Sequence, residues 1–170
     1  MALELIATDG SETGATSAAK INAVIEQLNN KTPKGAFSQL APTVYNLDDT
    51  DYTIADFDVL VVSRGGITAD LVTNKITIAE AGVVNASFGV DCDFAQQEEL
   101  VITFFINDLE MPTTPFSLQG IGDGKPNAIS WTTSVPVEAG DTIDMRFKNG
   151  DIGPFNANIR RMFLSVEADN

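Results

Sequence analysis

The closing part of this chain alternates apolar and polar residues in short runs separated by turn residues. Its last segment (127–170) reads NAISWTTSVPVEAGDTIDMRFKNGDIGPFNANIRRMFLSVEADN, with Gly-Asp and Asn-Gly turns between the alternating runs. A period of two places every second side chain on one face of a β-strand, and turn residues between such runs favour antiparallel neighbours. The pattern predicts short antiparallel strands in a β domain that assembles with other chains and has no catalytic role.

The composition restricts the number of domains and the kind of partner. The 170 residues suffice for one core, and a hydrophobic share of 44% indicates a globular chain. The formal net charge of −14 repels nucleic-acid backbones and anionic lipids, so we expect neither nucleic acid nor membrane as a partner. The chain has no apolar run of about 18 residues, and its N-terminus lacks the basic and apolar regions of a Sec signal.

Two residue types argue against an enzyme. The chain has no histidine and one cysteine, Cys92, which removes the commonest general base, the Ser-His-Asp arrangement, most zinc sites and any disulfide within the chain. Asp91 and Asp93 flank Cys92, and their negative charges raise a thiol pKa and so disfavour the reactive thiolate. We therefore predict a structural cysteine, no cofactor and no enzymatic activity.

One amphipathic helix is predicted over residues 16–29. Its apolar stripe consists of Ile21, Val24, Ile25 and Leu28. Because a helix this short is not stable in isolation, the stripe must pack on its own domain, on a symmetry mate or on a larger host structure. We predict that the stripe anchors the chain to a particle, within an N-terminal region (1–47) that consists of an arm, this helix and a linker.

The rest of the chain is predicted to form one head domain (48–170). Pro33, Gly35 and Pro42 predict that residues 31–47 are a linker with at most a short edge strand. Strands are predicted at 54–63, 67–72, 75–80, 83–95, 99–111, 115–122, 128–137, 142–149 and 157–168. In the fourth of these, one face carries Val84, Ala86, Phe88, Val90, Cys92 and Phe94. The regular spacing of the strands indicates a β-sandwich or jelly roll.

Asp48, Asp49 and Asp51 begin a cluster of carboxylates that continues through Asp56 and Asp58. Calcium binds oxygen-rich loops of this kind, so the first three are weak calcium candidates. The spacing of an EF-hand and its glycine are missing, which favours a solvated acidic loop without a bound metal.

Two further features point to ligands or partners. Trp131, the only tryptophan, is a candidate for stacking on a sugar ring, and its alternation with polar neighbours equally suits a half-buried strand residue. Arg160 and Arg161 are adjacent in a predicted strand, so their side chains are expected on opposite faces. One of them is expected to pair with an acidic neighbour across the sheet or across a subunit boundary.

Four segments among the predicted strands are informative through their order along the chain. From the N-terminal side they are KITIAEAGVVNASFGVDCDF, LVITFFIND, VPVEAGDTIDMRF and NIRRMFLSVEA. Together, between Ile76 and Val166, they resemble the tumour-necrosis-factor and complement-globular-head superfamily. The resemblance implies an all-β jelly-roll β-sandwich that assembles as a parallel homotrimer. The aromatic residues expected in the core or at the trimer interface are Phe104, Phe105, Phe147, Phe155 and Phe163.

The segment DGSETGATSAAKINAVIEQLN (9–29) resembles the entry segment of bacteriophage fibre and appendage proteins. This implies a virion protein that is made in the host cytoplasm and binds itself and the major capsid protein or another virion protein. A trimeric capsid decoration or head-fibre protein is the first hypothesis. The alternatives are a tail fibre or receptor-binding tip, a lectin-like module that binds a host-surface glycan, and a hydrolase that uses paired carboxylates.

Overall fold

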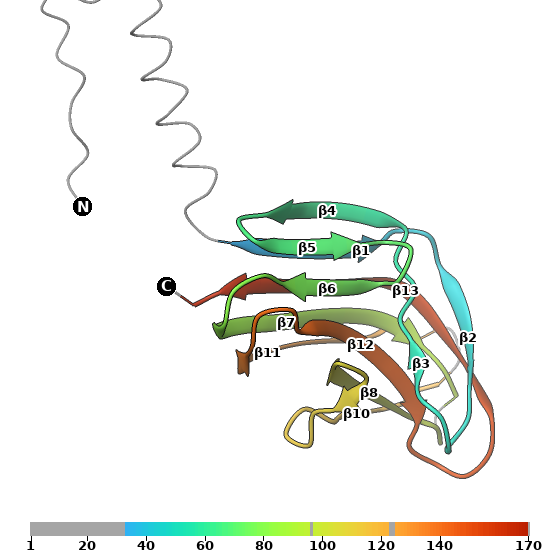
Figure 1. The fold of residues 1–170 in the computed structure, drawn as a ribbon. Coiled ribbons are helices and arrows are strands. Elements are labelled where there is room, and N and C mark those ends of the chain that lie inside the picture. Colours follow the sequence, from blue (N-terminus) through green and yellow to red (C-terminus); the bar gives the residue numbers. More distant parts are fainter. Residues whose placement is uncertain (1–32, 96, 123–124, 170) are drawn as a thin grey trace, which may run out of the picture. The chain divides into compact units, whose positions relative to one another are not determined.

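The computed structural model describes residues 33–95, 97–122 and 125–169 (Figure 1). The predicted helix over 16–29 and its anchoring stripe lie outside these residues and stay a prediction. The described residues form thirteen strands, and they contain no helix long and apolar enough to cross a bilayer. The strands are β1 (Lys34–Gln39), β2 (Thr43–Leu47), β3 (Thr53–Ile54), β4 (Val59–Arg64), β5 (Ile67–Asp70), β6 (Lys75–Ile78), β7 (Gly82–Asp93), β8 (Glu99–Ile106), β9 (Leu109–Glu110), β10 (Phe116–Gln119), β11 (Asn127–Val137), β12 (Thr142–Asn149) and β13 (Phe155–Ala168).

The strands of the described residues form one antiparallel sheet that curls on itself (Figure 1). Hydrogen-bonded neighbours follow the order β10-β8-β12-β6-β5-β4-β1-β13-β7-β11, with β2 on β13, β3 on β12 and β9 on β8. Phe88 of β7 and Phe104 of β8 lie far apart along this order, yet their ring centroids are 5.6 Å apart. The curl therefore brings two layers face to face. We name them the β13 layer (β1, β13, β7 and β11) and the β12 layer (β6, β12, β8 and β10).

Strict alternation along β7 builds much of the core. All six side chains predicted to share one face, from Val84 to Phe94, are buried, which confirms that prediction. Phe104, Phe147 and Phe155 belong to the same core. Fully burying a side chain of this size stabilises the fold by about 1.5–3 kcal/mol.

Two of the five selected phenylalanines lie elsewhere. Phe105 is buried on the other face of β8, where the guanidinium carbon of Arg146 lies 4.0 Å from its ring centroid. Phe163 is 41% exposed on the outward face of β13. Alternation explains both positions, because neighbouring strand residues point to opposite faces.

The prediction of a linker over 31–47 is wrong for most of that range. Strand β1 pairs with both β4 and β13, and β2 pairs with β13. Pro33 and Pro42 lie just outside these strands, where they remove no hydrogen bond from the sheet. Gly35 lies inside β1, where a Cβ would come within 2.8 Å of a methyl group of Ile67 and 2.9 Å of one of Ile76. The glycine therefore lets these two side chains pack against the backbone of β1 and does not mark a loop.

Two predicted strands are divided in the structure. The run 99–111 forms a β8–β9 hairpin, and its turn residues Asn107 and Asp108 have φ angles of 51° and 64°. Two consecutive residues with positive φ make the tight turn that matches the twist of a hairpin. The run 54–63 is interrupted between β3 and β4, where Ala55 and Phe57 are buried in the core.

Strand β13 contains a β-bulge at Arg160. Ile159 is the register partner of Cys92, and Arg161 is the partner of Asp91, so Arg160 is an extra residue between them. The bulge turns Arg160 and Arg161 toward the same side, which corrects the expectation of opposite faces. Odd-numbered residues are buried before the bulge, and even-numbered residues are buried from Met162 onward.

Candidate functional site

The outward face of the β13 layer is lined mainly by small side chains around one aromatic ring. Ser38, Phe163, Gly89 and Ser130 are successive register partners and form one row across β1, β13, β7 and β11. A Cβ on Gly89 would lie 2.2 Å from the Phe163 ring, so the ring lies directly over this glycine. The result is a low-relief face with a half-exposed phenylalanine at its middle.

A groove of about 470 Å³ lies on this face. We name it the β13 groove. Its apolar lining includes Leu40, Ile129 and Phe163, and Leu40 is 64% exposed. Apolar side chains left open to water in a hollow are typical of surfaces that another molecule covers.

Two buried acceptors beside the β13 groove lack a donor among the described residues. Asp91 is the register partner of the outward Arg161, whereas Gln39 is the register partner of the buried Met162 and belongs to the inward face. Gln39 is 2% exposed, and its Nε2 donates to the carbonyl oxygens of Ala41 at 2.5 Å and Ile159 at 3.4 Å. Its Oε1 and the Oδ1 of Asp91 are buried, and no group of the described residues donates to either. Sequence reasoning missed this pair because nothing in the strand pattern marks an unsatisfied acceptor.

The charges on the outward face of the β13 layer balance. The charged side chains pointing outward from its strands are Lys34, Asp91, Asp93, Arg160, Arg161 and Glu167. Lys34 pairs with Glu167 at 3.3 Å, and Arg160 pairs with Asp93 at 2.7 Å. The second pair confirms the expected acidic partner for the arginine dipeptide.

Asp91 and Arg161 are the charges left over on this face. They are register partners on β7 and β13, yet they form no ion pair with each other. Arg161 is exposed, and its side chain has no hydrogen bond or ion pair with the described residues. A neutral face with one unused charge of each sign contrasts with the net charge of −14 on the whole chain.

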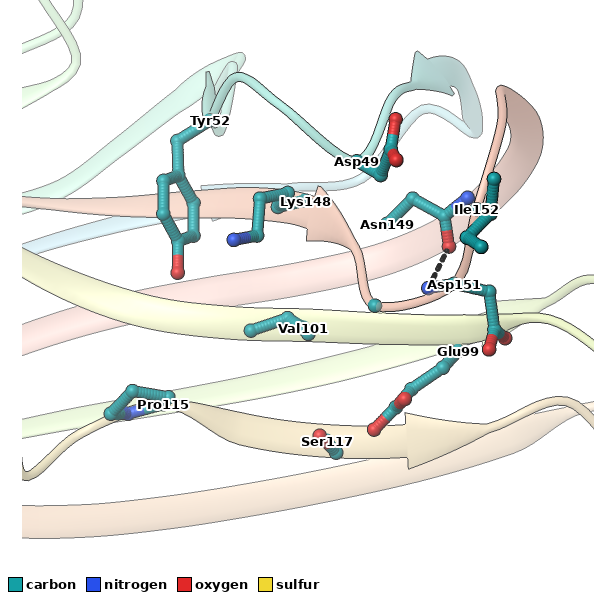
Figure 2. A pocket seen from close by; sticks show the side chains of 11 residues that line it. Asp49, Tyr52, Glu99, Val101, Pro115, Ser117, Lys148, Asn149, Asp151 and Ile152 are labelled. Atoms are coloured by element: carbon teal, nitrogen blue, oxygen red, sulfur yellow. Dashed lines mark hydrogen bonds between the residues drawn. The ribbon is translucent and has the colours of Figure 1, made fainter.

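A second hollow, also of about 470 Å³, lies over β8, β10 and β12 (Figure 2). We name it the β12 hollow. The Nζ of Lys148 is 4.6 Å from the ring centroid of Tyr52, and Figure 2 shows Glu99 and Ser117 on the opposite side of the opening. An aromatic ring, an ammonium group and carboxylates at one opening can recognise a polar ligand such as a sugar.

The acidic loop is a structural element. One oxygen of Asp48 accepts the backbone N–H groups of Thr50 at 3.0 Å and Asp51 at 2.7 Å, and these bonds lower the pKa of Asp48. Asp58 accepts the N–H groups of Leu40 and Ala41. The described residues contain no group of three or more acidic or cysteine side chains placed to hold a metal. The three calcium candidates are therefore not brought together.

Trp131 and Cys92 both pack against the core of the sandwich. The Trp131 ring is half-buried, with centroid distances of 6.1 Å to Phe104 and 6.2 Å to Phe88, which agrees with the half-buried strand position. Sugar stacking by Trp131 stays a prediction. Burial, followed by the charges of Asp91 and Asp93, raises the pKa of the Cys92 thiol to about 12. Its Sγ lies 3.6 Å from the carbonyl oxygen of Asn127. The geometry agrees with a structural cysteine.

The β12 layer carries an ionic cluster on its outward face. The buried Asp144 accepts hydrogen bonds from Arg146 at 2.6 and 2.9 Å, and Lys75 lies 3.8 Å away. Asp108 contacts the same Arg146 and also Lys75, and these two cations lower the pKa of Asp108. Each charged group has a partner, so the cluster serves structure.

The described residues define a jelly-roll β-sandwich of the kind found in tumour necrosis factors and complement globular domains. One similar solved structure is Eiger TNF from S. frugiperda, with a TM-score of 0.58 and 12% identity over 82% of this chain and 93% of that chain. Another is the globular domain of zebrafish complement 1qA protein, with a TM-score of 0.52 and 14% identity over 79% and 96% of the two chains.

These two structural similarities establish the fold alone, and they confirm the jelly-roll prediction. No family model matches the sequence, and no curated protein matches it. The homotrimer and the bacteriophage origin stay predictions.

Proposed function

We propose that this chain is a non-catalytic assembly protein that forms a homotrimer through the outward face of its β13 layer. The observation that carries the proposal is the β13 groove, where Phe163 and Leu40 are exposed on a face without net charge. A copy of the same chain suits this face because a neutral patch is where two strongly acidic molecules repel each other least. The family resemblance of the sequence implies the same oligomer.

Light scattering of the intact protein tests the homotrimer. The expected mass is three times the 18.1 kDa of one chain. Phe163→Asp places a charge in the middle of the proposed interface and is expected to shift the mass toward one chain. Val72→Asp is the matched control, because Val72 is 91% exposed and lies in the loop between β5 and β6. A wild-type protein that stays monomeric at micromolar concentrations would refute the homotrimer.

The proposal extends to a structural role on a bacteriophage particle, as a capsid decoration or head-fibre protein attached through its N-terminal region. The sequence of residues 9–29 supports this extension, since it resembles phage fibre and appendage entry segments and carries an apolar stripe suited to docking. Removal of residues 1–30 is expected to leave a folded trimer that no longer joins particles. Decoration of particles by the truncated protein would contradict attachment through the N-terminal region. A copy number of many trimers per particle would separate a decoration protein from a tail fibre or receptor-binding tip.

A lectin-like module is the second candidate, and the β12 hollow favours it over a site at Trp131. Tyr52 presents a ring beside Lys148, and the carboxylate of Glu99 can accept hydroxyl hydrogen bonds. Glycan-array binding that is lost in Glu99→Gln and retained in Trp131→Phe would place a sugar in this hollow. An array without signal for the wild-type protein would dispose of the module.

A further inference from the structure

We propose that the subunits of the homotrimer are joined by a polar contact in which Arg161 of one copy enters the β13 groove of the next and pairs with Asp91. This inference rests on the proposed homotrimer and names the residues that fix its geometry. It assigns a role to two side chains that the described part of a single chain leaves unexplained.

The first support is the unsatisfied acceptor of Asp91. Buried polar atoms in native proteins nearly always have a hydrogen-bond partner, either protein or ordered water. Asp91 lines the β13 groove, and its Oδ1 is buried and lacks a donor among the described residues. An N–H donor from a second copy that occupies the groove can fill this position in place of water.

The second support is the chemistry of Arg161. A guanidinium group carries five N–H donors in a fixed plane, a geometry that matches the two oxygens of a carboxylate. Arg161 is exposed at the rim of the groove, next to the ring of Phe163. Within its own chain, the bulge directs Arg160 to Asp93 at 2.7 Å and leaves Arg161 without an ion pair among the described residues.

The third support is symmetry. In a ring of three copies each interface joins two different surface patches, so Arg161 of one chain can meet Asp91 of the next. Every copy then donates one Arg161 and receives one. The contact cancels the leftover charge of Asp91 and fixes the register of the subunits, which an apolar face of small residues does not do.

Charge reversal tests the contact. Asp91→Lys and Arg161→Glu are each expected to raise the dissociation constant of the trimer by roughly 30-fold or more. The double variant Asp91→Lys/Arg161→Glu is expected to form trimers again. Lys148→Glu is the control. It makes the same charge change as Arg161→Glu, but on β12, outside the β13 layer, and it is expected to leave the mass of the trimer unchanged. Circular dichroism confirms that each variant is folded.

A crosslinking experiment separates a contact between chains from one within a chain. A refolded mixture of the Asp91→Cys and Arg161→Cys variants is expected to yield a disulfide-linked dimer on oxidation, which a link within one chain cannot produce. A trimeric wild type whose two charge-reversal variants stay trimeric, or a trimeric mixture that yields no covalent dimer, would overturn the contact and leave the homotrimer standing. A monomeric wild type would instead defeat the homotrimer itself.

Discussion

Asp144→Asn is expected to destabilise the fold by about 3–5 kcal/mol, the usual cost of removing one partner from a buried ion pair. Asp144 has no exposed side-chain surface, and both of its oxygens accept hydrogen bonds from Arg146. An asparagine of the same shape keeps one acceptor and turns an amide donor toward the guanidinium. One charge-assisted hydrogen bond of about 1.5–3 kcal/mol is lost, the other is weakened to a neutral acceptor, and Arg146 loses its buried counter-charge, which together account for a loss of this size. Domains of this length are stable by only about 5–15 kcal/mol.

Urea unfolding followed by the fluorescence of Trp131 measures this loss. Asp108→Asn is the matched control, because Asp108 contacts the same Arg146 but its side chain is 63% exposed. Solvent screens an exposed pair, so the control is expected to shift the unfolding midpoint by only a small fraction of the Asp144→Asn effect. All variants are compared at one protein concentration, since self-association stabilises the native state. Equal shifts for the two substitutions would refute the assignment of the stabilising role to burial.

Three further outcomes are expected. Gly120→Ala should destabilise the fold by about 1–3 kcal/mol in thermal unfolding, because its Cβ would lie 1.9 Å from the carbonyl oxygen of Ala95; an unchanged midpoint would contradict the contact. The Cys92 thiol, with its pKa raised to about 12 by burial, should react with a thiol reagent at pH 8 only after unfolding. The lowered pKa values of Asp48 and Asp141 should stabilise the fold above about pH 4 and lose that effect as the pH falls further. Unfolding midpoints of Asp48→Asn that follow the same acid limb as wild type would exclude a role for Asp48.

The sequence predicts the long strands well because their signal is local. Along β7 the alternation from Val84 to Phe94 fixes which side chains are buried, and the structure agrees at every position. The same reasoning fails at β1, where Gly35 marks an approach of the backbone to Ile67 and Ile76. That approach depends on residues distant in the chain, so no local pattern reveals it.

The candidate site depends on contacts between distant segments. The arginine dipeptide is visible in the sequence, but the bulge that places Arg160 and Arg161 on one side of the sheet depends on pairing with β7. The strongly apolar neighbours of Asn107 and Asp108 predict a strand through both, although both residue types tolerate positive φ. Leu40 carries no local signal, because its place in the groove appears only when β1 lies beside β13.

The bulge in β13 also determines which changes of chain length this strand can absorb. Removing Arg160 would leave Ile159 inward and Arg161 outward, so both halves of the strand would keep their present faces in a regular pleat. Removing a residue between Met162 and Val166 would instead exchange the buried and exposed sets on one side of the deletion. The bulge is thus a point of tolerance for insertions and deletions in an otherwise rigid strand, and related sequences should differ in length here before they do so anywhere else in β13.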